Sequence, residues 1–299
     1  MPHINLNTRV TSVESTYEED GQDPSQRVMM VRNGEQQVRE FDEVIVTVPL
    51  ACLKRETIKF LPDLRLNIRM AITNVTVSSL EKVYLTFPEA FWDKQSNSRD
   101  QADDEADKDD SKPLPGFTNF LNPISYAPPE HQTWCLELNP LSNPEHFGEH
   151  AQPALLFSIF GDCGQALSSR INRLSPTSQE YFDTINDFFR PYYSRLPNYS
   201  SSDQRCTPTA ILATNWQNDE FAYGSYTNFK VHLPQRDVKI DDAVRTMRYG
   251  IPERGVWIAG EHTAPFVGLG TSTGAYWSGE MAAMRVLGAY GLAGRVVGK

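Results

Sequence analysis

Close to its C-terminal end, the chain carries the stretch VWIAGEHTAPFVGLGTSTGAYWSGE at residues 256–280. The first four residues form a short apolar run typical of a buried β-strand, and the small and apolar residues at 275–287 are typical of a packed helix. A strand that enters a helix through Gly and Thr residues presents backbone N–H groups at the helix N-terminus, where they can hold an anionic or hydrogen-bonding ligand. Glycines selected only for tight packing explain the same spacing, and the spacing alone favours that interpretation.

Strand-like patterns also occur at the start of the chain. Apolar and polar residues alternate in three short runs, at 4–13, 28–31 and 41–48. The Asn33-Gly34 pair predicts a hairpin, because a type I′ turn needs positive φ at both central positions. The run VIVTV at 44–48 is nearly continuous and β-branched, which is typical of an α/β-sheet strand buried on both faces, and a proline ends it.

The middle of the chain mixes predicted helices and strands. The spacing of apolar residues predicts helices at 63–72 and after the start signal Ser175-Pro176-Thr177. Apolar runs predict strands at 83–87, 154–160 and 210–213. Together with the two ends of the chain, this order predicts an α+β fold.

The segment 93–115 has a different composition from the rest of the chain. Eight acidic residues stand against four basic ones, and hardly any residue is apolar. Such a segment cannot offset the entropy of ordering by burying apolar surface. We predict a disordered, solvated surface loop, with an acidic docking segment as the alternative.

The composition is that of a soluble globular protein. The chain has 299 residues, of which 39% are hydrophobic, enough for about two domains. A net charge of −10 argues against nucleic acid as a direct partner, and no apolar run approaches the roughly 18 residues of a membrane span. With neither a secretory signal nor a peroxisomal SKL ending, we expect an intracellular, cytoplasmic location.

The four cysteines are widely scattered and form no C-x-x-C pair. This spacing predicts reduced core thiols and no metal site or disulfide framework, for the following residues: Cys52, Cys135, Cys163 and Cys206. The sequence indicates nothing about the oligomeric state.

Four segments in order resemble the flavin-containing amine oxidases, a family that includes polyamine oxidases, monoamine oxidases and lysine-specific histone demethylases. The segments are INLNTRV at 4–10, VIVTVPLACLK at 44–54, LEKVYLTFPEAFW at 80–92, and AGEHT at 259–263 with GAYWSG at 274–279. The resemblance implies a partial FAD-binding lobe of mixed α/β structure and a substrate lobe with a mixed sheet and flanking helices. We expect the FAD lobe at 1–50 and 206–299, and the substrate lobe at 51–205.

The resemblance implies FAD as a non-covalent cofactor. Val10 matches a valine whose backbone meets the adenine, Glu261 would bond the ribityl or pyrophosphate region, and Thr271 and Ser272 would lie beside the isoalloxazine. For Glu261, a charge that only complements the helix dipole is the alternative. Ser225 stands where monoamine oxidases carry a cysteine tethered to the flavin, so we expect no covalent bond.

Two further positions match residues of the reaction site. Lys82 matches a lysine that holds water against flavin N5, where a fixed cation stabilises the negative charge that develops on oxygen; a surface lysine is the alternative. Tyr226, within GSYTN at 224–228, matches an aromatic residue that guides the amine by cation–π contact. The opposite wall, aromatic in plant polyamine oxidases and monoamine oxidases, is Thr271 here, so the aromatic cage is incomplete.

One element of the family is missing from the sequence. Family members begin with a βαβ unit that carries G-x-G-x-x-G and seats the pyrophosphate, and no such sequence occurs here. The chain therefore resembles a C-terminal portion of an amine oxidase, whether from truncation, a split gene or an incomplete gene model. We expect either an FAD-dependent oxidase that converts an amine, foremost a polyamine, to an imine and oxygen to hydrogen peroxide, or a non-catalytic remnant or interaction module unable to hold FAD.

Overall fold

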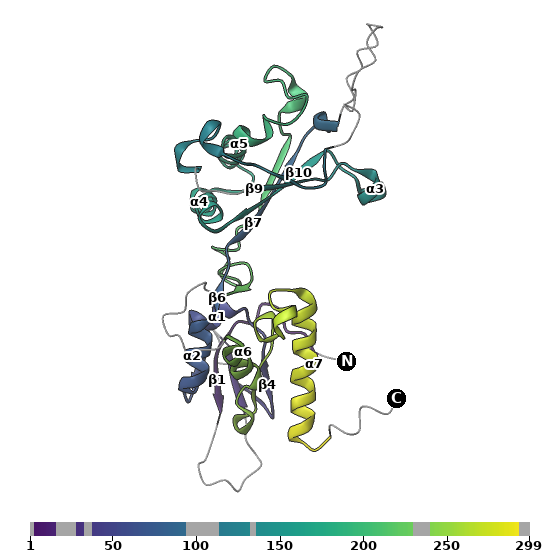
Figure 1. Ribbon diagram of the computed structural model, residues 1–299. Helices are drawn as coiled ribbons and strands as arrows, with labels where there is room; N and C mark the ends of the chain where they lie inside the picture. The colour runs from purple at the N-terminus through teal and green to yellow at the C-terminus, as the bar shows by residue number, and fades with distance from the viewer. Residues whose placement is uncertain are drawn as a thin grey trace. The chain divides into compact units, whose positions relative to one another are not determined.

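The computed structural model describes residues 3–15, 28–32, 38–93, 114–131, 136–229 and 240–292 (Figure 1). They form two compact units: Met1–Ser78 with Glu220–Lys299, and Ser79–Asp219. We call these the first and the second unit. Each has a hydrophobic core of its own.

The division differs from the expected boundaries near residues 50 and 205. The segment after residue 50 forms α1 (Leu50–Lys54), β5 (Lys59–Leu61) and α2 (Leu66–Asn74), all within the first unit. The reason is packing: β5 pairs in parallel with β1 (Val10–Ser15), and buried side chains of α1 and α2 join the core of that unit. The assignment of the units to FAD and substrate remains a prediction.

The first unit contains a four-stranded sheet at its N-terminal end. Its order is β3-β2-β1-β5, with β2 at Val28–Arg32 and β3 at Val38–Phe41. The predicted antiparallel pairing is confirmed, because β2 and β3 are antiparallel, but Val31 lies opposite Val38, whereas a two-residue turn at Asn33-Gly34 would place it opposite Gln36. Its Asn33-Gly34 turn lies outside the described residues.

The first unit also contains a parallel pair of short strands. In this pair β4 (Val44–Val46) runs beside β13 (Val256–Ile258), and Ile45 is level with Trp257. The prediction that β4 is buried on both faces is wrong, because Ile45 is 44% exposed. The physical reason is missing cover on one face, where Ile45 is partly exposed although its register partner Trp257 is buried.

Helices and a small ladder complete the first unit. They are α6 (Ile240–Tyr249), α7 (Ser272–Ala289) and the pair β6 (Thr76–Val77) with β12 (Thr227–Asn228). The core gathers Val46 and Ile258 from the parallel strands, Ile68 from α2 and Met247 from α6. This arrangement brings strand ends and the start of α7 into one unit.

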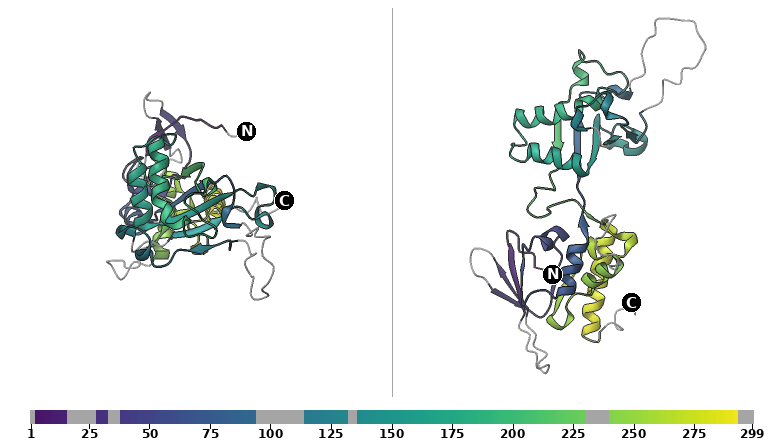
Figure 2. Two further views of the ribbon diagram at one scale, coloured as in Figure 1. Left: turned by 90° about the horizontal axis from the view of Figure 1, so that it is seen from above. Right: turned by 60° about the vertical axis from the view of Figure 1, so that its left-hand side comes forward.

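The second unit is built on a five-stranded sheet. Its order is β11 (Ala210–Ala213), β7 (Leu80–Thr86), β10 (Ala154–Phe160), β9 (Leu136–Pro140) and β8 (Thr118–Asn119). All four neighbouring pairs are antiparallel, so the sheet is not mixed as expected. Two helices, α4 (Gly161–Ile171) and α5 (Gln179–Tyr193), bury apolar faces against its core, and the short α3 (Pro144–Phe147) follows β9 (Figure 2).

Most predicted elements occur close to their expected bounds. The strands predicted at 154–160 and 210–213 are confirmed as β10 and β11. The helix expected after Ser175-Pro176-Thr177 begins at Gln179, because Ser178 is its N-cap and accepts a hydrogen bond from Tyr181 N at 3.2 Å. The acidic segment lies outside the described residues from 94 to 113.

The predicted burial of the cysteine side chains is confirmed where the structure describes them. Cys52, Cys163 and Cys206 are buried, whereas Cys135 lies outside the described residues. Burial raises the pKa of Cys163 to about 12, which keeps it a thiol. None of the described helices is long and apolar enough to cross a membrane.

Candidate functional site

The N-terminus of α7 is shaped by a close backbone contact. Thr271 is the N-cap, and its Oγ1 accepts from Gly274 N at 2.9 Å while donating to Gly268 O at 2.7 Å. A Cβ at Gly274 would lie 1.8 Å from Gly268 O, so glycine alone permits this approach. Thr271 and Ser272 are exposed, and the first turn of a helix carries backbone N–H groups without intrahelical partners.

Glu261 connects this helix start to β12. One carboxylate oxygen accepts from both the backbone N–H and the hydroxyl of Thr227, and the other accepts from Gly270 N at 2.8 Å. Burial raises the pKa of Glu261, and the bonds from Thr227 and Gly270 oppose that shift. The carboxylate therefore holds two backbone segments together, and its contact with FAD remains a prediction.

Tyr226 lies at the same place. Its ring contacts Gly270, where an added Cβ would be 3.1 Å from Tyr226 Cδ2, and Gly270 has a φ of +73° that L side chains rarely adopt. Tyr226 O accepts from Ser78 N at 2.7 Å, and Ser225 Oγ donates to Ser78 O at 2.9 Å. Tyr226 and Glu261 thus contact Gly270, which directly precedes Thr271 and Ser272, and the roles of these residues toward a flavin remain predictions.

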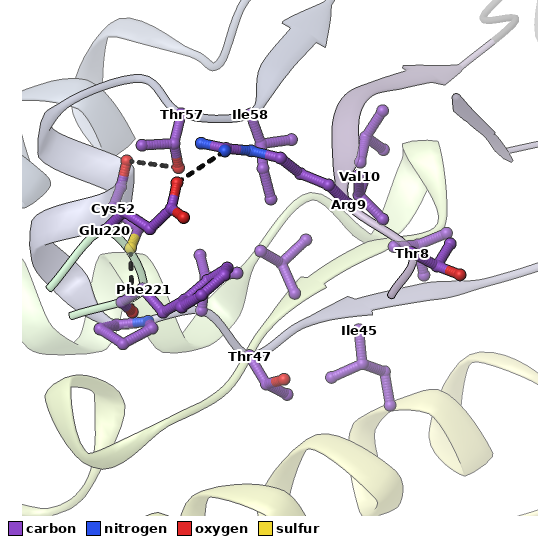
Figure 3. Close-up of a pocket in the computed structure, with 15 residues that line it drawn as sticks. Thr8, Arg9, Val10, Ile45, Thr47, Cys52, Thr57, Ile58, Glu220 and Phe221 are labelled. Atoms are coloured by element: carbon purple, nitrogen blue, oxygen red, sulfur yellow. Dashed lines mark hydrogen bonds and ion pairs between the residues drawn. The ribbon is translucent and has the colours of Figure 1, made fainter. Parts of the chain in front are cut away.

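Val10 lies elsewhere in the first unit. It lines a pocket of about 390 Å³ together with β4, the residues up to Pro49 and Phe221, whereas Tyr226, Glu261, Thr271 and Ser272 do not border this pocket (Figure 3). Arg9 Nη1 lies 2.8 Å from Glu220 Oε2 at the pocket. The backbone contact of Val10 with an adenine remains a prediction.

Lys82 lies in the second unit, on the more exposed face of β7. Along this strand Lys82, Tyr84 and Thr86 alternate with buried residues. Lys82 N donates to Thr214 Oγ1 at 2.8 Å, and Thr214 N donates to Lys82 O at 2.9 Å. The strand is therefore firmly held under Lys82, whose role beside a flavin remains a prediction.

Sequence reasoning missed the buried carboxylate of Glu81. This residue is 1% exposed, and it accepts hydrogen bonds from Thr214 Oγ1 at 2.6 Å and from the N–H groups of Trp216 and Gln217 at 3.1 Å. Ser168 Oγ donates to it at 3.4 Å. One signal was available, because a charged residue in phase with buried Val83 needs internal partners.

The residues of the first unit fit the flavin part of FAD. The exposed N-terminus of α7 offers N–H groups to carbonyl or anionic oxygens, and Tyr226 offers a half-exposed aromatic surface beside it. For the pyrophosphate, the sequence has no counterpart of the G-x-G-x-x-G turn. The chain therefore offers partners for the flavin end of the cofactor and no glycine-rich turn for its pyrophosphate.

The sequence profile of the flavin containing amine oxidoreductases matches residues 3–287. The chain belongs to this family. Polyamine oxidase 3 of Oryza sativa subsp. japonica is 28% identical over 250 residues, which are 82% of this chain and 40% of that protein. Lysine-specific histone demethylase 1 homolog 3 of Arabidopsis thaliana is 39% identical over 90 residues, which are 30% of this chain and 6% of that protein.

A solved structure of the family has the same fold. A putrescine oxidase redesigned in its cofactor binding matches with a TM-score of 0.59 at 15% identity, over 94% of this chain and 48% of that one. The α+β prediction is therefore confirmed, with two units in the fold of an FAD-dependent amine oxidase. The chain spans less than half the length of these relatives.

Proposed function

We propose that this chain supplies the flavin-facing and amine-facing part of an FAD-dependent amine oxidase. The observation that carries the proposal is the cluster of Tyr226, Glu261 and Thr271 around Gly270, in a chain whose family match runs from residue 3 to 287. The chemistry that FAD would supply when bound is acceptance of a hydride from the carbon beside a neutral amine and transfer of the electrons to oxygen, giving an imine and hydrogen peroxide. A polyamine is the proposed substrate, because polyamine and putrescine oxidases are among the relatives.

Glu261, Tyr226 and Lys82 each have a separate role in such an oxidase. Glu261 fixes the loop before α7, so that Thr271 and Ser272 present the helix N-terminus to the flavin without moving on binding. Tyr226 offers an aromatic face that attracts an amine in its cationic form and packs against its alkyl part. Lys82 contributes a fixed positive charge where negative charge develops on oxygen.

A second candidate is a non-catalytic interaction module. The specific observation in its favour is the missing G-x-G-x-x-G turn, since that turn supplies a large share of the N–H groups that hold a pyrophosphate. The two candidates differ in whether the chain contacts flavin at all.

Titration of FAD into the purified chain distinguishes them. We expect a reversible change in the flavin absorbance that is lost on gel filtration, because only one end of the cofactor finds its partners. Tyr226→Ala should reduce the size of this absorbance change at least tenfold. Tyr249 is an exposed tyrosine on α6, and Tyr249→Ala should leave the absorbance change as it is. Absence of any spectral change at millimolar FAD would favour the interaction module.

Anaerobic addition of an amine tests the chemistry. With FAD in excess, putrescine or spermidine should bleach the flavin band, and readmitted oxygen should restore it with release of hydrogen peroxide. A chain that perturbs the flavin spectrum but never bleaches it would bind the cofactor without being an oxidase.

A further inference from the structure

The hydrogen bonds between Lys82 and the end of β11 are irregular. The ladder between β7 and β11 ends where Ala213 lies opposite Val83. Thr214 follows and donates its N–H to Lys82 O at 2.9 Å, but Lys82 N donates to the hydroxyl of Thr214 at 2.8 Å. In a regular antiparallel pair this second bond would go to a backbone carbonyl. On this side, the backbone of Lys82 therefore depends on a side-chain hydroxyl.

The carboxylate of Glu81 orients this hydroxyl. Thr214 Oγ1 donates to Glu81 Oε2 at 2.6 Å. An ionised carboxylate only accepts hydrogen bonds, so the hydroxyl proton points toward Glu81 and an oxygen lone pair remains for Lys82 N. Two hydrogen bonds in series thus join Lys82 N to Glu81, and each bond polarises and strengthens the other. Without the carboxylate, the hydroxyl would be able to rotate away from Lys82 N.

The same carboxylate holds the chain around Thr214 in place. Its Oε2 also accepts from Trp216 N, and its Oε1 accepts from Gln217 N, each at 3.1 Å. Ser168 Oγ on α4 donates to Oε1 at 3.4 Å. Glu81 therefore ties both α4 and the turn after β11 to β7, which limits how far Thr214 can move.

Glu81 and Lys82 lie on opposite faces of β7. Neighbouring residues of a strand alternate between its faces, and Glu81 is 1% exposed whereas Lys82 is exposed. Val83 and Leu85 share the buried face with Glu81, so packing alone favours an apolar side chain at position 81. A buried charge is costly unless hydrogen bonds satisfy it. The carboxylate thus indicates a role other than packing.

The other end of the same strand pair provides a comparison. There Thr209 bonds Thr86 O, through its N–H at 2.7 Å and through its hydroxyl at 3.2 Å. Its hydroxyl proton therefore goes to a backbone carbonyl and not to a carboxylate. A threonine holds β7 at both ends of the pair, and the buried charge takes part at the end where Lys82 lies.

We propose that Glu81 is a positioning residue for Lys82 and acts through Thr214. By fixing the hydroxyl of Thr214, it holds the backbone under Lys82 so that the ammonium group keeps a constant place on the exposed face of the sheet. This role rests on the proposed function, in which that positive charge stabilises the negative charge developing on oxygen. Such stabilisation needs a group that is already in place, and a displacement of about 1 Å can cost a factor of about 10² in rate.

Amide hydrogen exchange tests the positioning without any flavin. Thr214→Val keeps the shape of the side chain and removes the hydroxyl, so we expect exchange at Lys82 N to accelerate about tenfold. Thr214→Ser keeps the hydroxyl and should leave this exchange slow. Thr209→Val is the matched control at the other end of the strand pair, and it should leave exchange at Lys82 N unchanged.

Glu81→Gln tests the relay through Thr214. Lys82 N donates to Thr214 and not to Glu81, yet its exchange should accelerate about threefold or more in this variant. The reason is that a glutamine side chain has one acceptor oxygen where the carboxylate has two, and it no longer fixes the hydroxyl of Thr214. Unchanged exchange at Lys82 N in either Thr214→Val or Glu81→Gln would overturn the proposal.

The two half-reactions test whether the positioning serves the charge of Lys82. In FAD-loaded protein, Thr214→Val should slow reoxidation by oxygen about tenfold and leave reduction by an amine unchanged, and Thr214→Ser should keep the original rate of reoxidation. In Lys82→Met protein, Thr214→Val should slow reoxidation no further, because the positioned charge is absent.

A purely structural role of Glu81 and Thr214 predicts different kinetics. Thr214→Val would then slow both half-reactions equally, or it would slow reoxidation as much with Lys82→Met as without it, and either result would overturn the proposal. Reoxidation that Lys82→Met leaves unchanged would instead refute the proposed function of Lys82. Exchange at Lys82 N would still decide whether Glu81 holds its backbone, so the two failures can be told apart.

Discussion

Gly274 and Gly279 lie five residues apart on α7 and have different surroundings. A Cβ on Gly274 would be 1.8 Å from Gly268 O, whereas one on Gly279 would meet no atom within 4 Å. We expect Gly274→Ala to lower the free energy of unfolding by about 1–3 kcal/mol through overpacking. Gly279→Ala should raise it by about 0.5–1 kcal/mol, because alanine has the higher helix propensity. Urea unfolding of both variants measures the contrast, and equal shifts would contradict the close contact at the helix start.

His262 makes stability depend on pH. Its ring is 1% exposed, and burial lowers its pKa to about 4 from 6.5. A histidine that protonates less readily when folded contributes stability above pH 6.5, and this contribution is lost as the pH falls from 6.5 through 4. The loss for such a shift is about 3 kcal/mol.

Replacing His262 should reduce this dependence on pH. We expect His262→Gln to flatten the fall in unfolding free energy between pH 6.5 and 4, although buried His131, whose pKa burial also lowers, keeps part of it. His150→Gln, at an exposed position, is the control and should leave the slope unchanged. A His262→Gln slope equal to that of the unsubstituted chain would mean that the ring is not kept neutral by burial.

Lys82→Met separates the two half-reactions of the proposed oxidase. In FAD-loaded protein we expect reoxidation of the flavin by oxygen to slow on the order of 10²-fold, because the fixed cation is lost. Reduction by the amine should change little. Lys54→Met, on α1, is the control, and stopped-flow absorbance follows both steps. Equal slowing of the two steps would remove Lys82 from this role.

For single helices and strands, the sequence predicts where a strand lies better than it predicts how deeply that strand is buried. The strands predicted at 154–160 and 210–213 are confirmed, because short and dense apolar runs of this length are typical of buried strands. The burial of β4 is wrong because the same β-branched run occurs whether or not a neighbour covers it, and only the structure shows the exposed Ile45. The local apolar pattern therefore predicts the strand, whereas its burial depends on which other elements pack against it.

For the candidate site, the sequence predicts which residues take part but not the contacts between them. Tyr226, Glu261 and Thr271 could be selected because each lies in a recognisable segment, and the structure gathers them around Gly270. The bonds of Glu261 to Thr227 and Gly270 could not be predicted, because they join segments that are distant in the sequence. Glu81 was missed for the same reason, since its partners lie more than 80 residues away.

The turn at 214–217 depends on the carboxylate of Glu81. Glu81→Ala would remove the acceptor of several part-buried donors, among them the N–H groups of Trp216 and Gln217. We expect the free energy of unfolding to fall by about 2–4 kcal/mol, since each such donor costs about 1–3 kcal/mol. Exchange of these two amides should accelerate, whereas Glu280→Ala, exposed on α7, should change neither quantity. Unchanged exchange in Glu81→Ala would show that the turn is held by other contacts.

The two units differ in which parts of the chain form them. The second unit is one continuous segment, Ser79–Asp219, and every residue of its core cluster lies within it. The first unit needs both ends of the chain, because Val46 and Ile68 share its core with Met247, Val256 and Ile258. The two cores should therefore respond differently to cutting the chain.

We expect a fragment of residues 79–219 to fold alone and a fragment of residues 1–78 to remain unfolded. The first contains a complete sheet, its helices and its whole apolar core, whose burial is the main stabilising contribution in a domain of this size. The second retains β1 and α2 but lacks the partners of Val46 and Ile68 from the C-terminal half. Near-ultraviolet circular dichroism and urea titration should show fixed aromatic packing and one cooperative transition for the first fragment only, because rings such as Phe157 and Phe189 pack together within it. A fragment 79–219 without a cooperative transition would mean that its core depends on the first unit.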